Sequence, residues 1–286
     1  MITVSHTADS LPVSLKPLEL GSGRVEAQCD EEGRWHGRLL TTSTRGYADA
    51  QLDDHRHSPR TGFPHRPPFR LSLRARTSIS QPLGTFGFGL WNDPFSLSLG
   101  QGGAARRLPA APQALWFFYA SPPTDIALVP GLPGWGWKAT ALRSRRVPTL
   151  LLAPLAAAGV VVGRVPLLRR IVFAQAKRFY MAEETLLPED PRLWHRYEID
   201  WSPGSAEFRV DDRLVLSTPC TPVPPLGLVL WIDNQYAVAS PSRGFGFGVL
   251  DLITDQWLEI TDLEVEGRSA QISSVHGRII ARQLAR

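Results

Sequence analysis

Hydrophobic and polar residues alternate along many short segments of the chain. In residues 69–76, Phe69, Leu71 and Leu73 are separated by arginine or serine. Comparable segments occur at residues 24–29, 38–42, 47–54, 194–201, 206–210, 214–216 and 257–266. Side chains on a strand point alternately to opposite faces of a sheet. The pattern therefore predicts antiparallel strands with one buried face and one polar face.

Two further segments, residues 86–93 and 226–236, contain glycine and apolar residues followed by a Trp-x-Asp sequence. Alternation places Trp91 with Asp93, and Trp231 with Asp233, on the face opposite the apolar row. Residues 114–120 are apolar at nearly every position, which predicts a strand in the middle of a sheet. These three segments are expected to form the floor of a cleft.

The composition favours an all-β protein. The 24 glycines and 25 prolines interrupt short apolar runs, as a sandwich with many turns requires. We predict one sandwich domain over residues 23–266, a loosely attached lead-in over residues 1–22, and a basic tail over residues 267–286.

Residues 142–190 depart from the strand pattern and predict a helical insert. Its part from Leu142 to Met181 contains eight basic residues and no acidic one, so the net charge of +4 belongs to this segment and a nucleic-acid partner is not expected. Residues 150–162 are uncharged but shorter than the roughly 20 residues of a bilayer span. The insert could be a lid, a packed satellite hairpin, or a peripheral membrane contact over residues 142–180.

Cysteines and targeting signals give few constraints. The two cysteines, Cys29 and Cys220, form no disulfide framework and have no metal-binding spacing. Residues 53–57 contain Asp and His in poor zinc spacing, so a solvated loop is expected, with structural calcium left open and no other cofactor or metal predicted. No secretory signal or transmembrane helix is visible in the sequence, and the expected location is cytoplasmic.

The order of segments in the second half of the chain resembles laminarinase-like family 16 glycoside hydrolases. The resemblance lies in residues 194–201, 208–212 and 225–231 and extends more weakly over residues 24–266. It implies a concanavalin A-like jelly roll of two antiparallel sheets, with glycans bound on the concave sheet. The chain departs from the family because residues 114–120 lack the catalytic Glu-x-Asp-x-Glu motif. Glu198 and Asp200 are expected to point outward, so no catalytic role is carried over.

The candidate ligand-binding residues combine aromatic rings with hydrogen-bonding groups. Sugars present apolar C–H faces together with hydroxyl groups, so tryptophan beside carboxylate or amide oxygens suits them. The candidates are Trp91, Trp116 and Trp231 for stacking, Asp93, Asp233, Asn92 and Asn234 as acceptors, and Arg74 as a possible cleft cation. Core packing, loop capping and a solvated strand face are the respective structural alternatives.

Three functions follow from these residues. The leading one is binding of a carbohydrate or glycoconjugate in the concave cleft without family 16 chemistry. The second is glycoside hydrolysis by Asp93 and Asp233, which requires carboxyl groups roughly 5 to 9 Å apart. The third is binding of an apolar or lipid-linked ligand at a membrane surface through the insert. The sequence alone identifies no catalytic residue.

Overall fold

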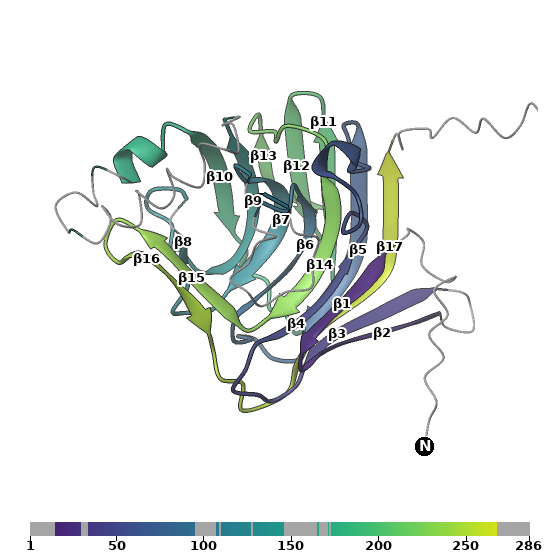
Figure 1. The fold of residues 1–286 in the computed structure, drawn as a ribbon. Helices are drawn as coiled ribbons and strands as arrows, with labels where there is room; N and C mark the ends of the chain where they lie inside the picture. Colours follow the sequence, from purple (N-terminus) through teal and green to yellow (C-terminus); the bar gives the residue numbers. More distant parts are fainter. Residues whose placement is uncertain are drawn as a thin grey trace, which may run out of the picture.

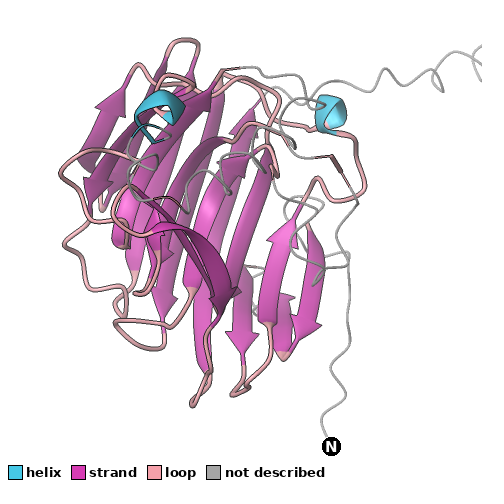
Figure 2. Ribbon diagram, turned by 60° about the vertical axis from the view of Figure 1, so that its left-hand side comes forward, coloured by secondary structure: helices cyan, strands magenta, loops and turns pink. Residues whose placement is uncertain are grey.

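The computed structural model describes residues 15–29, 34–94, 107–108, 110–126, 128–145, 165, 171 and 173–267. These residues form two stacked seven-stranded sheets and one small sheet (Figures 1 and 2). Within each large sheet, every pairing between neighbouring strands is antiparallel. The predicted two-sheet jelly-roll sandwich is confirmed.

One large sheet, here called the front sheet, carries the Trp-x-Asp segments. Its strands, in spatial order, are β1 (Lys16–Gly21), β4 (Ala48–Asp53), β14 (Gly227–Asp233), β6 (Thr85–Trp91), β7 (Gln113–Ala120), β9 (Gly136–Ser144) and β10 (Tyr180–Leu186). The apolar strand β7 lies inside the sheet between β6 and β9, as its composition predicts.

The other large sheet, the back sheet, covers the opposite side of the core. Its strands, in spatial order, are β13 (Arg213–Thr218), β12 (Ser205–Val210), β11 (His195–Ser202), β5 (Phe69–Thr77), β17 (Gln256–Gly267), β3 (Trp35–Thr41) and β2 (Gly23–Cys29). The small sheet contains β16 (Gly244–Val249), β15 (Gln235–Ser240) and β8 (Asp125–Ile126), and β15 pairs with β8 in parallel. A short 3₁₀ helix at Arg60–Gly62 precedes β5.

The core between the sheets is built from alternate residues of each strand. Phe86, Phe88 and Leu90 of β6 are at most 1% exposed and point into it. They meet aromatic residues of the back sheet, and the Phe88 ring lies 5.1 Å from that of Tyr197. Because Phe86, Phe88 and Leu90 point into the core, the residues between them must lie on the other face of the front sheet.

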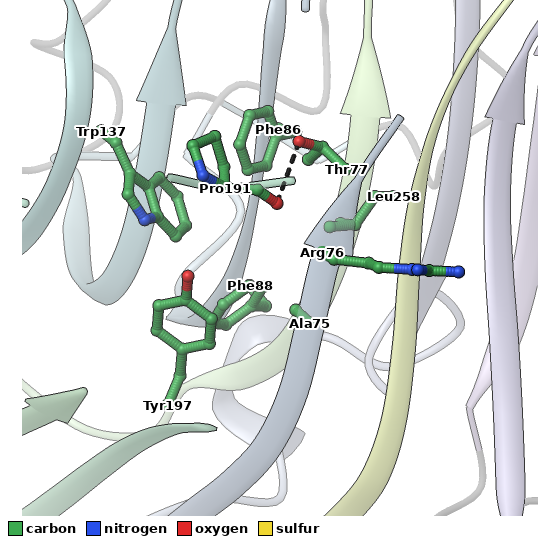
Figure 3. Close-up of a pocket in the computed structure, with 9 residues that line it drawn as sticks. All are labelled: Ala75, Arg76, Thr77, Phe86, Phe88, Trp137, Pro191, Tyr197 and Leu258. Atoms are coloured by element: carbon green, nitrogen blue, oxygen red, sulfur yellow. Dashed lines mark hydrogen bonds between the residues drawn. The ribbon is translucent and has the colours of Figure 1, made fainter. Parts of the chain in front are cut away.

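Figure 3 shows a gap at one end of this core, lined by Phe86, Phe88, Trp137 and Tyr197 among others. The gap leaves no room for a water molecule. The Thr77 hydroxyl donates a hydrogen bond of 3.2 Å to the Pro191 carbonyl beside it (Figure 3). The gap is therefore a feature of core packing rather than a ligand site.

Two details of the predicted organisation are wrong. The lead-in is shorter than residues 1–22, because β1 pairs with β4 along its whole length as the edge of the front sheet. The sandwich also extends into residues 142–190, since β9 ends at Ser144 and β10 pairs with it.

What remains of the predicted insert lies between β9 and β10. Residues 173–176 are helical, and the Phe173 ring stacks on Phe245 of β16 at 4.7 Å. Residues 146–164, 166–170 and 172 lie outside the described residues, so the lid and the membrane contact over residues 142–180 stay predictions. The tail over residues 268–286 also lies outside the described residues.

Candidate functional site

Four aromatic rings gather on the face of the front sheet that points away from the core, here called the platform face. The Trp231 ring centroid lies 6.4 Å from that of Trp91, 5.6 Å from Trp116 and 5.9 Å from Phe118. Trp91 and Trp231 are parallel to within 6°. Trp231 is 8% exposed, whereas the other three rings are half-buried. The structure therefore brings together the three tryptophans that the sequence proposed, and adds Phe118.

Glycines in β6 make room for these rings. Gly87 pairs with Trp231 across the sheet, and a Cβ atom at Gly87 would lie 2.7 Å from the Trp231 ring. Gly89, two residues further, has φ 147°, and a Cβ atom there would lie 2.8 Å from the Trp116 Cβ. Neither glycine has a side chain on the platform face, so rings from β14 and β7 cover the backbone of β6 there.

A buried histidine fixes Trp91 at one end of the platform. The Trp91 indole Nε1 donates to His55 Nε2 at 3.1 Å. His55 Nδ1 lies 3.2 Å from the Leu228 carbonyl oxygen, so it carries the ring proton and donates there. The His55 ring occupies the space above Gly227, where a Cβ atom would lie 2.3 Å from it. This arrangement holds the Trp91 ring in one orientation.

At the opposite end, hydrogen bonds connect Trp231 to a carboxyl group. Trp231 Nε1 donates to Thr85 Oγ1 at 2.9 Å, and Thr85 Oγ1 donates to Asp233 Oδ1, also at 2.9 Å. The same oxygen accepts the backbone N–H groups of Thr85 at 3.2 Å and Gln235 at 3.0 Å. The partly exposed Asp233 side chain is therefore fixed directly beside the aromatic platform.

A second carboxyl group, Asp49 of β4, lies directly opposite Asp233 in the strand register. Cβ atoms of such cross-strand neighbours are about 5 Å apart. Asp49 is only 6% exposed, and its Oδ1 is buried without a hydrogen-bond partner among the described residues. Burial and the Asp233 charge raise the Asp49 pKa well above its ordinary value, although a hydrogen bond from Tyr47 opposes this.

The pKa of Asp233 is also raised, to about 7. Burial is the cause, and it outweighs the hydrogen bonds from Gln235 and Thr85 that favour the charged form. The Tyr47 pKa is raised as well, by burial and by the charges of Asp49 and Asp233. Neighbouring carboxyl groups with raised pKa values are typical of binding and catalytic sites.

The sequence-predicted pair of Asp93 and Asp233 is not formed. Thr85, at the start of β6, is opposite Asp233, and Trp91 lies six residues further along the same strand. At about 3.3 Å per residue, Asp93 is on the order of 20 Å or more from Asp233. The hydrolytic pairing of these residues is therefore wrong, since such groups must lie within roughly 10 Å of each other.

Asp93, Asn92 and Asn234 support the loops. Asp93 has φ 46°, and its carboxylate forms a buried ion pair with Arg107. The Asn92 side chain bonds to the backbone of Ala111 and Gln113. Asn234 is fully buried. The structure thus places Asn92 and Asn234 in backbone-capping roles, which is the structural alternative to ligand binding. It places Asp93 in an ion pair.

Arg74 lies far from the platform face. It is on β5 in the back sheet, where Leu73 and Ala75 point into the core and Arg74 is exposed on the outer side. Its guanidinium lies 5.8 Å from the Trp194 ring centroid. The prediction that Arg74 lines the cleft is wrong, because β5 belongs to the other sheet.

A buried ion pair borders the platform on the side of β9 and β10. Lys138, which is opposite Phe118 in the register, lies 3.2 Å from Glu184 Oε2. Thr140 donates to Glu184 Oε1 at 3.2 Å. Burial raises the Glu184 pKa, although the Lys138 charge opposes this. Polar groups thus flank the rings on both sides, with Asp49 and Asp233 at the other border.

Sequence reasoning missed Asp49, Tyr47 and Phe118. Asp49 lies in the alternating segment 47–54, in which the clearer signal is the pair of acidic residues at its end, Asp53 and Asp54. Phe118 is two residues from Trp116, so the period of a strand predicts that they share a face. Their ring centroids are 5.4 Å apart.

Among the described residues, no cluster of three or more His, Cys, Asp or Glu side chains is arranged to hold a metal ion. Within the same residues, no helix has the length and apolar character needed to cross a membrane.

No protein-family description matches the chain, and no curated protein is similar to it in sequence. Solved structures match the chain at low identity and with TM-scores below 0.5 in the examples that follow. An endo-β-galactosidase from Clostridium perfringens is 12% identical over 87% of this chain, with a TM-score of 0.38. This chain spans 58% of the length of that enzyme.

Two further solved structures match over most of both chains. The carbohydrate recognition domain of Emp47p is 11% identical over 88% of this chain and 95% of its own, with a TM-score of 0.41. A β-glucanase from Bacillus licheniformis is 11% identical over 85% of this chain and 82% of its own, with a TM-score of 0.38.

Proposed function

We propose that the platform face binds carbohydrate. The observation that carries this proposal is the group of half-buried rings around Trp231, bordered by the Asp233 carboxyl group. Aromatic rings offer apolar surface to the C–H face of a sugar, and adjacent polar groups bond to its hydroxyls. A set of rings that served only the core would lie between the sheets, whereas these lie on the opposite side of the front sheet.

The rings are held in place before any ligand binds. Trp91 is oriented by His55, and Trp231 by Thr85. Rigid groups lose little conformational freedom on binding, which favours affinity. This preorganisation supports a binding role over a flexible hydrophobic surface.

The test is a titration of tryptophan fluorescence with a panel of soluble glycans, with release of reducing sugar measured in the same samples. The informative variant is Trp116→Ala, because Trp116 lies in the ring group without a hydrogen bond from its Nε1 among the described residues. Loss of one stacking ring is expected to weaken binding by roughly two- to tenfold, since an aromatic contact contributes about 0.5–1.5 kcal/mol.

The matched control is Trp257→Ala. Trp257 is half-buried and belongs to β17 of the back sheet, where Arg38 and Arg76 lie over its ring. Its loss is expected to leave glycan affinity unchanged. Equal weakening by both substitutions, or the absence of saturable binding to every glycan, would contradict the proposal. Release of reducing sugar would show that the site also hydrolyses its ligand.

A further inference from the structure

Strand β4 presents residues 49, 51 and 53 to the platform face, since Ala50 and Leu52 between them point into the core. Asp49 and Asp53 are buried, with exposed fractions of 6% and 1%, whereas Gln51 is half-buried. In the strand register, Gln51 lies opposite Trp231. Gln51 is therefore the residue of β4 that a molecule on the platform face can reach.

The amide group of Gln51 is held in one orientation by Asp53. Gln51 Nε2 donates to Asp53 Oδ2 at 2.8 Å, and the same oxygen accepts Arg56 Nε at 3.0 Å. A carboxylate paired with a guanidinium offers acceptor atoms alone, so the amide must present its nitrogen to Asp53. Gln51 Oε1 is therefore on the branch of the amide that does not contact Asp53.

This amide oxygen is left for a further donor. No group among the described residues donates a hydrogen bond to Gln51 Oε1, and the oxygen is not shielded from water. A fixed and accessible acceptor beside aromatic rings can bond to a hydroxyl group with little loss of side-chain freedom.

The bond between Gln51 and Asp53 is not needed to compensate the Asp53 charge. Arg56 donates to Asp53 from its backbone N–H, its Nε and its Nη2, and the His55 N–H donates as well. Water could serve the half-buried amide equally well in a protein that binds nothing here. What the bond with Asp53 adds is a defined direction for Gln51 Oε1.

We propose that Gln51 is a ligand-binding residue whose amide oxygen accepts a hydrogen bond from a hydroxyl group of an uncharged sugar chain that lies across the platform rings. This inference rests on the proposed carbohydrate binding and specifies what is recognised, namely a free hydroxyl group at the β4 border of the rings. An uncharged sugar is favoured because the carboxyl groups of Asp49 and Asp53 flank Gln51 along the strand and repel an anionic one.

The experiment compares the parent protein with Gln51→Met. The probes are the neutral members of the glycan panel, hexasaccharides of β-glucose, β-galactose and β-mannose, each in its unmodified and its O-methylated form. Methionine has nearly the length of glutamine and a flexible, apolar side chain, so it retains the bulk at this position and removes the amide. Affinities are measured by titration of tryptophan fluorescence.

The parent protein is expected to prefer the unmodified form, since a methoxy group cannot donate a hydrogen bond. Gln51→Met is expected to bind the unmodified form roughly two- to tenfold more weakly, the usual contribution of one neutral hydrogen bond. Its affinity for the O-methylated form is expected to stay within about twofold of the parent value. A merely structural role of Gln51 would not produce this difference between the two forms.

The matched control is Gln28→Met, because Gln28 is an exposed glutamine on β2 of the back sheet. It is expected to leave both affinities unchanged. Gln51→Ala removes the amide together with most of the side chain and is expected to lose the same preference for the unmodified form. It keeps the test decisive if Gln51→Met fails to fold, which denaturant unfolding shows.

The outcomes separate this inference from the proposed function. Equal losses of affinity for the two forms in Gln51→Met, or no loss for either, overturn the role of Gln51 and leave carbohydrate binding intact. Binding of anionic glycans alone does the same. Absence of binding of every glycan in the panel to the parent protein overturns the proposed function and the role of Gln51 together.

Discussion

The indole rings of Trp91 and Trp231 lie parallel on neighbouring strands, 6.4 Å between centroids and 6° between planes. They come from segments that are 140 residues apart in the sequence, and Gly87 provides the space in which the Trp231 ring lies. The parallel arrangement of the two rings therefore depends on the absence of a side chain at Gly87 as well as on the two tryptophans.

Substitution of Gly87 is therefore expected to disturb the platform. A Cβ atom at this position would lie 2.3 Å from the Phe117 carbonyl oxygen and 2.7 Å from the Trp231 ring. Gly87→Ala should lower the free energy of unfolding by about 1–3 kcal/mol, as overpacking does, and should alter the near-ultraviolet circular dichroism of the tryptophans. Gly62→Ala is the control, because its nearest neighbours lie at 3.6 Å. Equal stability of the two variants would contradict the close contact.

The buried ion pair of Arg56 and Asp53 should be important for stability. The two side chains are 9% and 1% exposed. Arg56→Ala leaves the Asp53 carboxylate buried without its cation, which typically costs about 3–5 kcal/mol. Denaturant unfolding measures the loss. Arg213→Ala removes a 59% exposed arginine from its pair with Glu189 and should change stability little. A small effect at Arg56 would mean that water reaches Asp53.

Asn234 should be required for the connection between β14 and β15. Its side chain accepts the Ala48 N–H at 2.8 Å and donates to the carbonyl groups of Gly46 at 2.8 Å and Leu250 at 2.7 Å. Asn234→Ala leaves these backbone groups without partners, each at a cost of about 1–3 kcal/mol. Amide hydrogen exchange should increase at Ala48. Asn234→Asp retains the acceptor alone and should fall between the parent protein and the alanine variant.

The carboxyl pair should make the protein less stable as the pH rises. The pKa of Asp233 in the folded protein, about 7, lies above the ordinary aspartate value, so the folded state binds more protons between about pH 4 and pH 7. Stability is then greatest at the acidic end of this window and decreases as the pH increases through it. Thermal unfolding at several pH values measures this slope.

Asp49→Asn removes the part of this slope that comes from Asp49, whose pKa is raised by burial and by the Asp233 charge. Its melting temperature should exceed that of the parent protein at about pH 8, and the difference should shrink toward about pH 5. Asp53→Asn is the matched substitution on the same strand, and it should destabilise the protein because it weakens the bonds with Arg56. A lower melting temperature for Asp49→Asn at the alkaline pH would show that the Asp49 charge is compensated.

Much of the fold could be predicted from the sequence, because burial on one face leaves a period of two. Strands β5, β11 and β17 follow that period, and β6 and β7 are recognised by apolar or glycine residues at nearly every position; all five lie where the sequence predicts them. Strand β10 does not follow it, since as an edge strand its residues are nearly all partly exposed. Nothing local in its sequence identifies β9 as its partner.

The site could be predicted only in part, because register is a long-range property. Alternation places Trp91 and Trp231 opposite the apolar rows of their own strands, and the structure brings their rings together with that of Trp116. The partner of Asp233 depends on which residue lies opposite it on another strand, and that is Asp49 rather than Asp93. Likewise, alternation does not show which of the two sheets contains Arg74, so it cannot distinguish a position in the cleft from one on the outer side of the back sheet.

The glycines of β6 determine which positions of the platform face can be substituted to change ligand binding. Between its end residues Thr85 and Trp91, this strand contributes no side chain to the platform face, so the other rings there, Trp116, Phe118 and Trp231, come from β7 and β14. Replacements at positions 116, 118 and 231 can therefore vary the shape of that surface while the backbone beneath it stays the same. A combinatorial library at these three positions would alter ligand preference without rebuilding the scaffold.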